Sequence, residues 1–482
     1  MLIDPRGWQG AVSGNVAFPN VGLAYLIPTL QKKGHDIAVI DLNNEAVTNK
    51  QIITNISNNK PDVLGISVKT ATMKDARILA QEIKKYFPLL PIILGGPHTK
   101  FEYNELIKEP WFDYVFVGEG EFIFPSMCDA LVAHQSMEQF QGLVTKQGST
   151  KDFCLKRQLI ADFDLDSISF PDYTLFPEAV IKSLHTAYPL VTSRGCVYKC
   201  SYCSVPEISG RNFRKRSPEN IIKELTWARK KYNAEGFQII DDVFNLDINR
   251  SKQICTALIE SSLNMKWSCP NGLRADRVDP ELAGLMFKSG CRSVSVGVES
   301  ADPDILKAVK KGETIEDIQK GIQTFKDAGI EVNGFFIVGL PGDSFKSEEM
   351  SVEFAKKMDI SAHFNMLVPY PGTEFWQWAK INAKFLGDPE DGLHFSNKSD
   401  KVRSVIETND FSVSDRQQAY EMVNTRLRRF DMLIPRDISR LRYIYEVIRL
   451  LWKYDKRKIF IYLIKKVGYK IIKITGNSNN RN

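Results

Sequence analysis

The chain has 482 residues, of which 43% are hydrophobic, and carries a formal net charge of +6, so it holds enough apolar sequence for two or three globular domains. It shows no basic segment followed by an apolar run at its start and no apolar stretch long enough to span a bilayer, so we expect neither a secreted nor a membrane-spanning protein. Its eight cysteines are not arranged as a disulfide framework, which predicts a reducing, cytoplasmic location.

Helix and strand patterns alternate from residue 20 onward. Three segments have helical spacing of apolar residues and four are short apolar runs, namely helices at 21–33, 49–58 and 72–86 and strands at 36–41, 62–67, 91–95 and 114–117. Short apolar strands separated by helices predict a parallel sheet covered on both faces. We therefore expect an α/β fold that begins with a doubly wound, Rossmann-like domain, with its ligand site at the carboxyl ends of the strands.

Glycine-rich loops follow two of these strands at the predicted ligand edge. Glycine lets a backbone approach a ligand closely. Together with the first helix and strand, these loops resemble the cobalamin-binding domain that precedes the core of B12-dependent radical S-adenosylmethionine (SAM) enzymes. The resemblance covers residues 1–145 and implies cobalamin contacts from two loops, made of Gly95, Gly96, Pro97 and His98, and of Gly118, Glu119 and Gly120.

The ligand below cobalt is left open by the sequence. Many cobalamin proteins carry an Asp-x-His-x-x-Gly motif after the first strand, whereas the corresponding loop here, residues 4–10, contains no histidine. His98 lies in a different loop. It is either a residue of the cobalamin site, in contact with the corrin edge or with the metal, or a loop histidine hydrogen-bonded to the backbone.

A compact cysteine motif follows a predicted linker at 146–187 and a strand at 188–192. Cys196, Cys200 and Cys203 have the spacing C-x3-C-x2-C. A [4Fe–4S] cluster normally takes four thiolates, so three on one short loop leave one iron for another ligand. The alternatives are a zinc knuckle or buried free thiols, but zinc sites usually use paired spacings, and no second pair is present.

This spacing, with Tyr202 just before the third cysteine, resembles the signature of the radical SAM family. The resemblance implies that the amino and carboxylate groups of SAM chelate the open iron. It further implies that an electron from the cluster cleaves SAM to a 5′-deoxyadenosyl radical. Such an enzyme requires an electron donor, for example flavodoxin or ferredoxin.

Strand and helix patterns continue after the cysteines. The strands are expected at 236–240, 266–269, 293–297, 332–338 and 362–368, and the helices at 218–231, 280–288, 315–328 and 347–358. With the strand at 188–192, they match the partial (β/α)6, TIM-type barrel of radical SAM enzymes, which we place at 188–373. Catalytic side chains of β/α barrels gather at the carboxyl ends of strands, and this rule selects Asp241, Asp242, Arg274, Glu299, Ser300 and Gly339.

The resemblance assigns most of these residues to SAM. It places Asp241 and Asp242 at the amino group, Glu299 and Ser300 at the ribose, and Gly339 beside the adenine. We expect Asp241, Asp242 and Glu299 to act in catalysis, and the others, with Tyr202, to bind the cofactor. An aspartate pair at a strand end is otherwise a solvated turn. Arg274 would face the SAM carboxylate, unless it pairs with Asp276 or Asp279 at the surface.

Residues 374–482 are predicted to form a helical, basic C-terminal region, part of which covers the barrel mouth in relatives. Within it, 440–473 hold eleven Lys and Arg against two acidic residues, so the rest of the chain carries a net charge of −3. This segment fits a helix that either packs on the barrel with a solvated basic face or makes a peripheral contact with an anionic membrane. Nucleic-acid binding is not expected, because no RNA-binding module accompanies it.

We therefore expect an enzyme that uses a [4Fe–4S] cluster, SAM and cobalamin to methylate an unactivated carbon of a small-molecule, lipid or peptide substrate. One alternative keeps these cofactors but performs ring formation, ring contraction or another oxidative rearrangement. Another is a non-catalytic metal-binding or membrane-recruited scaffold. A methylthiotransferase is not expected, because its N-terminal domain would need three cysteines and this one offers only Cys128.

Overall fold

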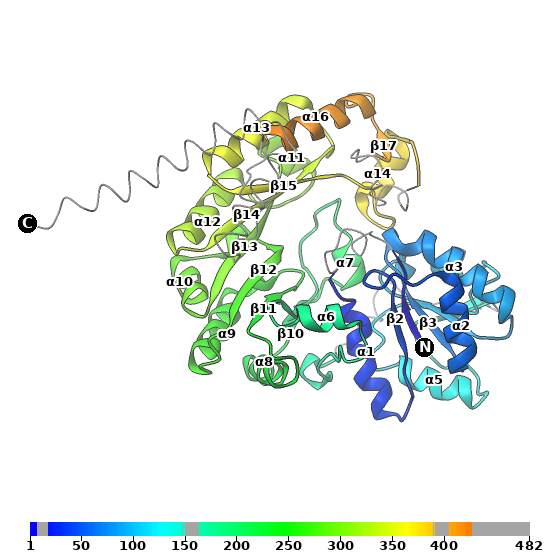
Figure 1. Ribbon diagram of the computed structural model, residues 1–482. Helices are drawn as coiled ribbons and strands as arrows, with labels where there is room; N and C mark the ends of the chain where they lie inside the picture. Colours follow the sequence, from blue (N-terminus) through cyan, green and yellow to red (C-terminus); the bar gives the residue numbers. More distant parts are fainter. Residues whose placement is uncertain (7–17, 147, 150–162, 389, 391–403, 427–482) are drawn as a thin grey trace, which may run out of the picture. The chain divides into compact units, whose positions relative to one another are not determined.

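The computed structural model describes residues 1–6, 18–146, 148–149, 163–388, 390 and 404–426, which are organised around two large sheets (Figure 1). The chain from Met1 to Asn424 forms one compact unit. The basic segment at 440–473 lies outside the described residues. Within the described part of the chain, no helix has both the length and the apolar character that a membrane crossing requires.

The first sheet has seven strands in the order β2-β1-β3-β4-β5-β6-β7. The strands are β1 (Leu2–Asp4), β2 (Val39–Asp41), β3 (Leu64–Ser67), β4 (Ile92–Gly95), β5 (Tyr114–Phe116), β6 (Leu143–Thr145) and β7 (Gly148–Ser149). The helices between them are α1 (Val21–Lys32), α2 (Asn49–Asn59), α3 (Met73–Tyr86), α4 (Thr99–Leu106) and α5 (Phe124–Val132). Strands β1 to β5 pair in parallel, which confirms the doubly wound fold and predicts a ligand site between β1 and β3.

Two parts of this sheet differ from the sequence-based prediction. Strand β1 lies before residue 20 and is the second strand of the sheet, between β2 and β3, with Leu2 opposite Val39 on one side and Gly65 on the other. Strands β6 and β7 add an antiparallel edge. These strands have two or three residues each, too few to produce a recognisable periodicity.

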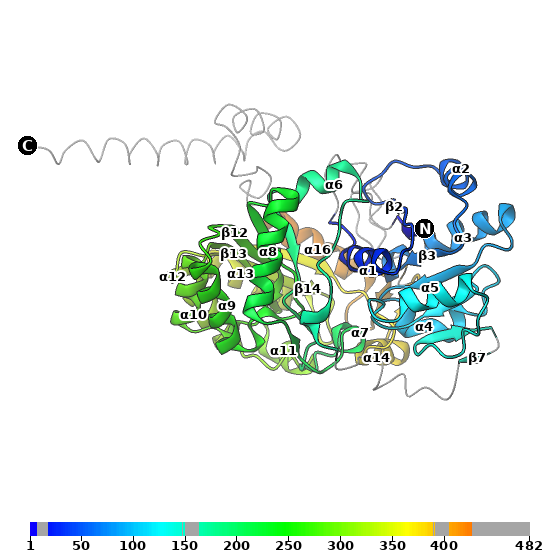
Figure 2. The same cartoon turned by 90° about the horizontal axis from the view of Figure 1, so that it is seen from below.

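The second sheet has six parallel strands in the order β15-β14-β13-β12-β11-β8. The strands are β8 (Tyr188–Leu190), β11 (Gly236–Ile239), β12 (Lys266–Leu273), β13 (Cys291–Glu299), β14 (Glu331–Val338) and β15 (Ser361–Met366). The helices are α8 (Pro218–Tyr232), α9 (Ile248–Glu260), α10 (Pro280–Lys288), α11 (Pro303–Ala308), α12 (Ile315–Asp327) and α13 (Phe345–Lys357). Helices α9, α10 and α12 lie along the outer face of the sheet (Figures 1 and 2). The predicted partial (β/α)6 barrel is therefore confirmed.

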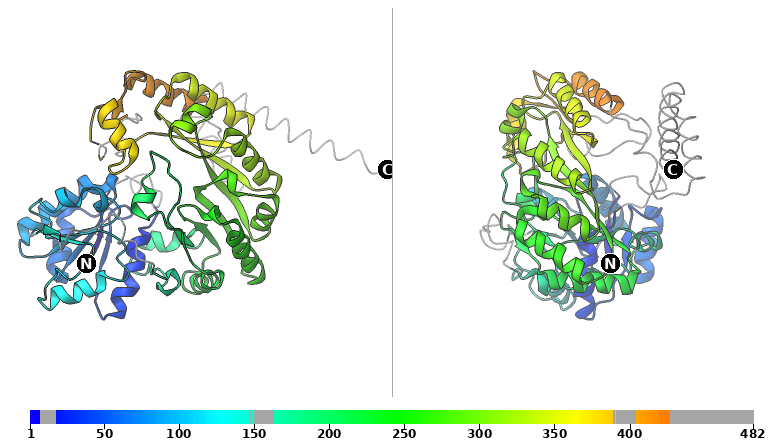
Figure 3. Two further views of the ribbon diagram at one scale, coloured as in Figure 1. Left: turned by 180° about the vertical axis from the view of Figure 1, so that it is seen from behind. Right: turned by 90° about the vertical axis from the view of Figure 1, so that its left-hand side faces the viewer.

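Shorter elements connect and extend the two sheets. They are η2 (Thr70–Thr72), η3 (Leu165–Ser167), α6 (Glu178–Ser183), β9 (Ser193–Arg194), α7 (Val205–Ile208), β10 (Arg214–Lys215), η4 (Phe244–Leu246), η5 (Ala275–Arg277), α14 (Glu374–Asn382), β16 (Lys384–Phe385), β17 (Ile406–Glu407) and α16 (Val413–Arg426). Helix α6 lies inside the predicted linker. Figure 3 shows β12 to β15 on the inner side of the helices.

Candidate functional site

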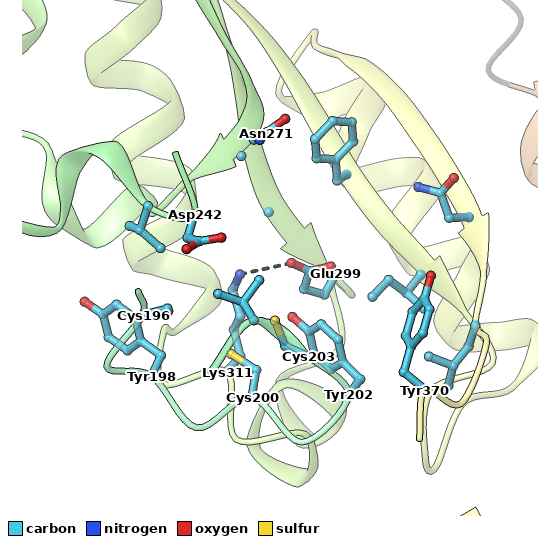
Figure 4. A pocket seen from close by; sticks show the side chains of 18 of the residues that line it. Cys196, Tyr198, Cys200, Tyr202, Cys203, Asp242, Asn271, Glu299, Lys311 and Tyr370 are labelled. Atoms are coloured by element: carbon cyan, nitrogen blue, oxygen red, sulfur yellow. Dashed lines mark hydrogen bonds and ion pairs between the residues drawn. The ribbon is translucent and has the colours of Figure 1, made fainter. Parts of the chain in front are cut away.

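A cavity of about 520 Å³ opens at the carboxyl ends of the six-stranded sheet. Cys196, Cys200 and Cys203 line it from the loop that follows β9 (Figure 4). Residues at or just after the ends of β11 to β15 complete its walls, among them Asp242, Asn271, Glu299, Ile337 and Met366. The structure thus brings the three cysteines together at the edge where the sequence predicts the site.

The cysteine loop is tied to the sheet by hydrogen bonds at its start. The backbone N–H of Cys196 donates to the carbonyl of Gly210 over 3.0 Å. The backbone N–H of Gly195 donates to the carboxylate of Asp242 over 2.8 Å. Because Asp242 follows β11, the first cysteine is positioned by a rigid element.

The chemistry of the three sulfur atoms fits an iron–sulfur cluster. Burial raises the pKa of each thiol, and that of Cys203 to about 12. The positive charge of Lys311 acts in the opposite direction on Cys200. Iron ligands are thiolates, so cluster binding would release protons from buried thiols. Three sulfur donors on one cavity suit a [4Fe–4S] cluster with one open iron better than a four-ligand zinc site.

Glu299 lies on the cavity wall in an unusual backbone conformation. Its φ angle is +66°, in the left-handed region that costs a non-glycine residue free energy and often marks functional sites. The pairing of β13 with β14 shifts register between Gly297 and Glu299. The carboxylate of Glu299 accepts a hydrogen bond from Lys311 Nζ over 3.0 Å (Figure 4). Burial and Glu299 together raise the pKa of Tyr202 on the same wall.

The two predicted aspartates face different surroundings. Asp242 lines the cavity, whereas Asp241 does not. Asp241 is 3% exposed and its carboxylate accepts hydrogen bonds from the backbone and hydroxyl of Thr192 and from the hydroxyl of Ser193. Its oxygens are therefore engaged in holding the strand that leads to the cysteines.

Arg274 reaches the cavity wall, but its guanidinium is engaged elsewhere. It donates to Asp276 over 2.8 Å and to the carbonyls of Lys311 and Gly312 over 2.9 and 3.0 Å. It also stacks over the ring of Tyr198, 3.6 Å from the ring centre. The predicted pairing with Asp276 is present, although it is buried rather than at the surface, since Arg274 is 4% exposed.

Ser300 and Gly339 stand behind the cavity wall rather than on it. The Ser300 hydroxyl accepts from the backbone N–H of Asp302 over 3.2 Å. The N–H of Gly339 donates to the carboxylate of Asp343 over 2.7 Å, and its carbonyl accepts from Arg416 over 3.0 Å. Gly339 therefore joins the loop after β14 to α16.

Glu348 lies beside this Gly339 loop and makes the stability of the folded chain depend on pH. The residue is 2% exposed, and its Oε1 atom has no hydrogen-bond partner. Burial and the neighbouring carboxylate of Asp343 raise its pKa well above the ordinary value. The folded chain therefore holds a proton that the unfolded chain releases. The stability that this proton contributes is present below the ordinary pKa and is lost as the pH rises through the raised value.

Replacing Glu348 by glutamine should remove this dependence. As the pH rises above the ordinary pKa of a glutamate toward the raised value, wild-type stability should fall relative to Glu348→Gln by up to about 1.4 kcal/mol per pH unit. Urea denaturation across that pH range measures it. Glu353→Gln is the matched control, because Glu353 lies on the exposed face of the same helix. Parallel curves for wild type and Glu348→Gln would contradict the assignment.

A second cavity, of about 580 Å³, lies at the carboxyl edge of β1, β3, β4 and β5. Six of the seven predicted loop residues line it, namely Gly95, Gly96, Pro97, Gly118, Glu119 and Gly120. A Cβ atom added at Gly95 would meet nothing within 4 Å. The backbone there faces free space, which fits the close approach of a large planar ring such as a corrin.

Gly96 is the loop residue with the strictest requirement for glycine. Its φ angle is +99°, and an added Cβ would lie 2.6 Å from the backbone N and O of Val68. The left-handed conformation alone costs alanine about 1–2 kcal/mol, and the backbone contact must move the loop as well. We expect Gly96→Ala to lower both stability and cobalamin occupancy of the reconstituted protein.

Gly34→Ala separates the two costs of that substitution. Gly34 has a φ angle of +83°, but an added Cβ would meet nothing within 4 Å. It should therefore show the conformational cost in thermal unfolding and retain bound cobalamin, measured by its visible absorbance. Equal cobalamin occupancy in Gly96→Ala and Gly34→Ala would show that the loop does not contact the ring.

Charged residues join the second cavity to the cysteine loop. Arg194, two residues before Cys196, donates to Glu119 and Glu121 over 2.7 Å each. Arg214 also bonds to Glu119. Burial acts to raise the pKa of Glu119, but the two guanidinium groups outweigh it and lower the pKa. Glu119 is therefore an anion that holds the cysteine loop against the glycine loops, a role beyond the predicted cofactor contact.

His98 does not line the second cavity. Its Nδ1 atom lies 3.2 Å from the hydroxyl of Thr70, and its Nε2 atom faces the carboxylates of Glu102 and Glu390. Only its main chain makes the predicted hydrogen bond to the backbone, since its N–H donates to the carbonyl of Val68 over 3.2 Å, whereas the partners of its ring are side chains. No histidine in the described part of the chain lines this cavity, so these residues offer no imidazole below cobalt.

The structure adds two residues that the sequence analysis did not select. Lys311 lies in a loop between two helices, where the strand-end rule does not apply. Asn271 projects from a part of β12 where the register with β13 shifts, a feature common beside active sites. Asn271 and Asp242 line both cavities, so the two chambers share a wall.

Comparisons with known proteins match both halves of the site. The model of the Radical SAM superfamily matches residues 190–355, and that of the B12 binding domain matches residues 11–127. The uncharacterized methyltransferase PH0819 of Pyrococcus horikoshii is 33% identical over 371 residues, which cover 76% of this chain and 80% of the relative. The anaerobic magnesium-protoporphyrin IX monomethyl ester cyclase of Rubrivivax gelatinosus is 26% identical over 488 residues, covering 97% and 85%.

A solved structure shares the fold. The radical S-adenosylmethionine methyltransferase TsrM from Kitasatospora setae, with cobalamin and a [4Fe–4S] cluster bound, superimposes with a TM-score of 0.70. The alignment covers 90% of this chain and 89% of TsrM at 17% sequence identity. The similarity includes both sheets.

Proposed function

The chain belongs to the cobalamin-dependent radical SAM enzymes, whose cofactors are a [4Fe–4S] cluster, SAM and cobalamin, and we propose that it methylates an unactivated carbon of a small-molecule substrate. When bound, these cofactors supply a carbon-centred radical that removes a hydrogen atom and a methyl group that replaces it. The protein must then hold the substrate carbon within reach of both chambers.

The shared wall between the cavities carries this proposal. Asp242 and Asn271 line the chamber of the cysteines and the chamber of the glycine loops. The side-chain NH₂ of Asn271 donates to the carbonyl of Ile240 over 2.8 Å, and this bond holds the side chain in place. A substrate seated against this wall would have one carbon near both cofactors, as methyl transfer requires.

The remaining residues take roles that their positions support. Cys196, Cys200 and Cys203 hold the cluster, and Asp242 and Glu299 offer carboxylates to the ammonium and ribose of SAM. Asp241, Ser300 and Gly339 position these groups from behind the wall, and Arg274 does so from the wall itself. On the side of β14 and β15 the cavity has apolar lining, including Phe335, Ile337 and Met366, which would exclude water from a reactive radical.

Product analysis tests the proposal. The anaerobic holoprotein is incubated with SAM, a reductant such as reduced flavodoxin, and candidate substrates, and the nucleoside products are quantified. Methylation should yield S-adenosylhomocysteine and 5′-deoxyadenosine in equal amounts, because one SAM donates the methyl group and another the radical. Formation of 5′-deoxyadenosine alone with a converted substrate would favour the rearrangement alternative, which the similarity to a cyclase keeps open.

Asn271→Ala should uncouple the two chambers. We expect it to retain SAM cleavage, since Asn271 is not one of the three cysteines, and to lower the ratio of S-adenosylhomocysteine to 5′-deoxyadenosine by up to about 100-fold, the loss that a misplaced substrate can cause. Asn365→Ala is the matched control, because Asn365 lines the first cavity but not the second. An unchanged product ratio in Asn271→Ala would show that the shared wall does not position the substrate.

A further inference from the structure

One imidazole and two carboxylates form a cluster apart from both cavities. His98 follows β4, Glu102 lies in α4, and Glu390 belongs to the segment after β16. One ligand atom from each lies within 4.8 Å of the others. None of the three residues lines either cavity, so the cluster is not part of the proposed active site.

The distances within the cluster suit a metal ion better than hydrogen bonds. His98 Nε2 lies 3.5 Å from Glu102 Oε2 and 3.5 Å from Glu390 Oε1, beyond the ordinary range of about 2.7–3.2 Å for an N–H···O bond. Ligands bound at about 2.0–2.1 Å to a tetrahedral Zn²⁺ ion are separated by roughly 3.3–3.5 Å. His98 is 1% exposed, yet its Nε2 atom has no hydrogen-bond partner.

The second ring nitrogen of His98 is held as in known metal sites. Its Nδ1 atom lies 3.2 Å from the Thr70 hydroxyl. Metal-binding histidines usually donate their other N–H to an oxygen, which fixes the tautomer and aims the free nitrogen at the metal. Thr70 is itself buried, at 7% exposure, so this contact is shielded from water.

Charge balance points in the same direction. Arg77 donates to Glu109 over 2.9 Å and also bonds to Glu390. The carboxylates of Glu102, Glu109 and Glu390 and the guanidinium of Arg77 together carry two net negative charges when His98 is neutral. Protonation of His98 would remove one of them. A divalent cation would neutralise both, and it would use the unpartnered nitrogen.

We propose that His98, Glu102 and Glu390 bind Zn²⁺, with water as the fourth ligand. A nitrogen and two carboxylate oxygens around an open fourth position belong to the donor sets that zinc accepts. The site fastens Glu390 to α3 and α4, because Arg77 of α3 holds the second oxygen of the Glu390 carboxylate. Its role is to join segments of the chain, independent of methyl transfer.

Metal analysis of the full-length holoprotein tests this site. The cluster is reconstituted first, so that the three cysteines are occupied, and the protein is then equilibrated with ZnSO₄ and dialysed. Mass spectrometry of the metals should find one zinc per wild-type chain and none in His98→Ala. Glu102→Gln should also lose the zinc. This variant covers the case in which His98→Ala does not fold, since the Glu102 side chain is 33% exposed.

His35→Ala is the matched control. His35 pairs with a single carboxylate, that of Asp129, over 3.0 Å, so this variant should keep one zinc per chain. Wild-type protein without zinc, or equal zinc contents in wild type and Glu102→Gln, would overturn the proposal. In that case protonated His98 forms ion pairs with the two carboxylates, and no metal binds there.

Discussion

Cys200→Ala should abolish reductive cleavage of SAM. Cys200 is one of three thiols on a single cavity, and without it the cluster would have only two protein ligands. Loss of an outer partner of a metal ligand already costs about 10–100-fold, so removal of a ligand itself should reduce 5′-deoxyadenosine formation by more than about 100-fold. The iron and sulfide content and the brown absorbance of the reconstituted protein should fall in parallel.

Cys255→Ala is the control for this substitution. Cys255 is a fully buried cysteine of α9 outside the cavity lining, so its replacement removes a thiol without touching the site. It should retain iron, sulfide and SAM cleavage. If Cys200→Ala cleaved SAM at the wild-type rate, the assignment of the cluster to this loop would be wrong.

Arg416→Ala should produce the largest loss of stability among the substitutions considered. The residue is 1% exposed, and its guanidinium donates to the carbonyls of Gly339 and Phe411 over 3.0 Å each. Asp343 and Glu348 lie near its charge. Removing one partner of a buried charged group costs about 3–5 kcal/mol, because the remaining polar groups stay buried without compensation.

Denaturation in guanidinium chloride measures the effect of this substitution. The control is Gln417→Ala, which alters a partly exposed residue of the same helix whose side-chain hydrogen bond lies in solvent, and it should change the free energy of unfolding by less than about 0.5 kcal/mol. Equal stability of Arg416→Ala and Gln417→Ala would show that α16 does not depend on the buried guanidinium.

The elements that could be predicted from sequence are those whose signal is local. The spacing of Cys196, Cys200 and Cys203 specifies a shared ligand without any knowledge of the fold, and the structure places all three on one cavity. The six strands of the second sheet alternate with helices along the chain, and most of them are apolar runs, so their type and sequence order follow from the pattern. The glycine loops follow from the rule that ligands bind at strand ends.

The orientation of side chains at a strand end was harder to predict. The strand-end rule selects Asp241 and Asp242 together, but successive residues of an extended chain point to opposite sides. Asp241 therefore faces Thr192, while Asp242 faces the cavity. Gly339 was selected by the same rule, and it contacts Arg416, which is distant in sequence and carries no local signal of its position.

Irregular backbone and contacts between distant parts of the chain explain why other site residues could not be predicted. Asn271 reaches both cavities where the pairing of β12 and β13 is interrupted, and a regular alternation does not anticipate such a bulge. Lys311 comes from a loop after α11 and meets Glu299 only in the folded chain. Glu390, which faces the ring of His98, is likewise nearly 300 positions away from it in the chain.

The hydrogen bonds of Arg194 couple the ordering of the cysteine loop to the ordering of the glycine loop that carries Glu119. This side chain stands two residues from the first sulfur ligand and grips Glu119 and Glu121 beside the corrin chamber. A ligand that orders one loop should also order the other. A newly synthesised chain without cobalamin should therefore bind and retain the iron–sulfur cluster less readily.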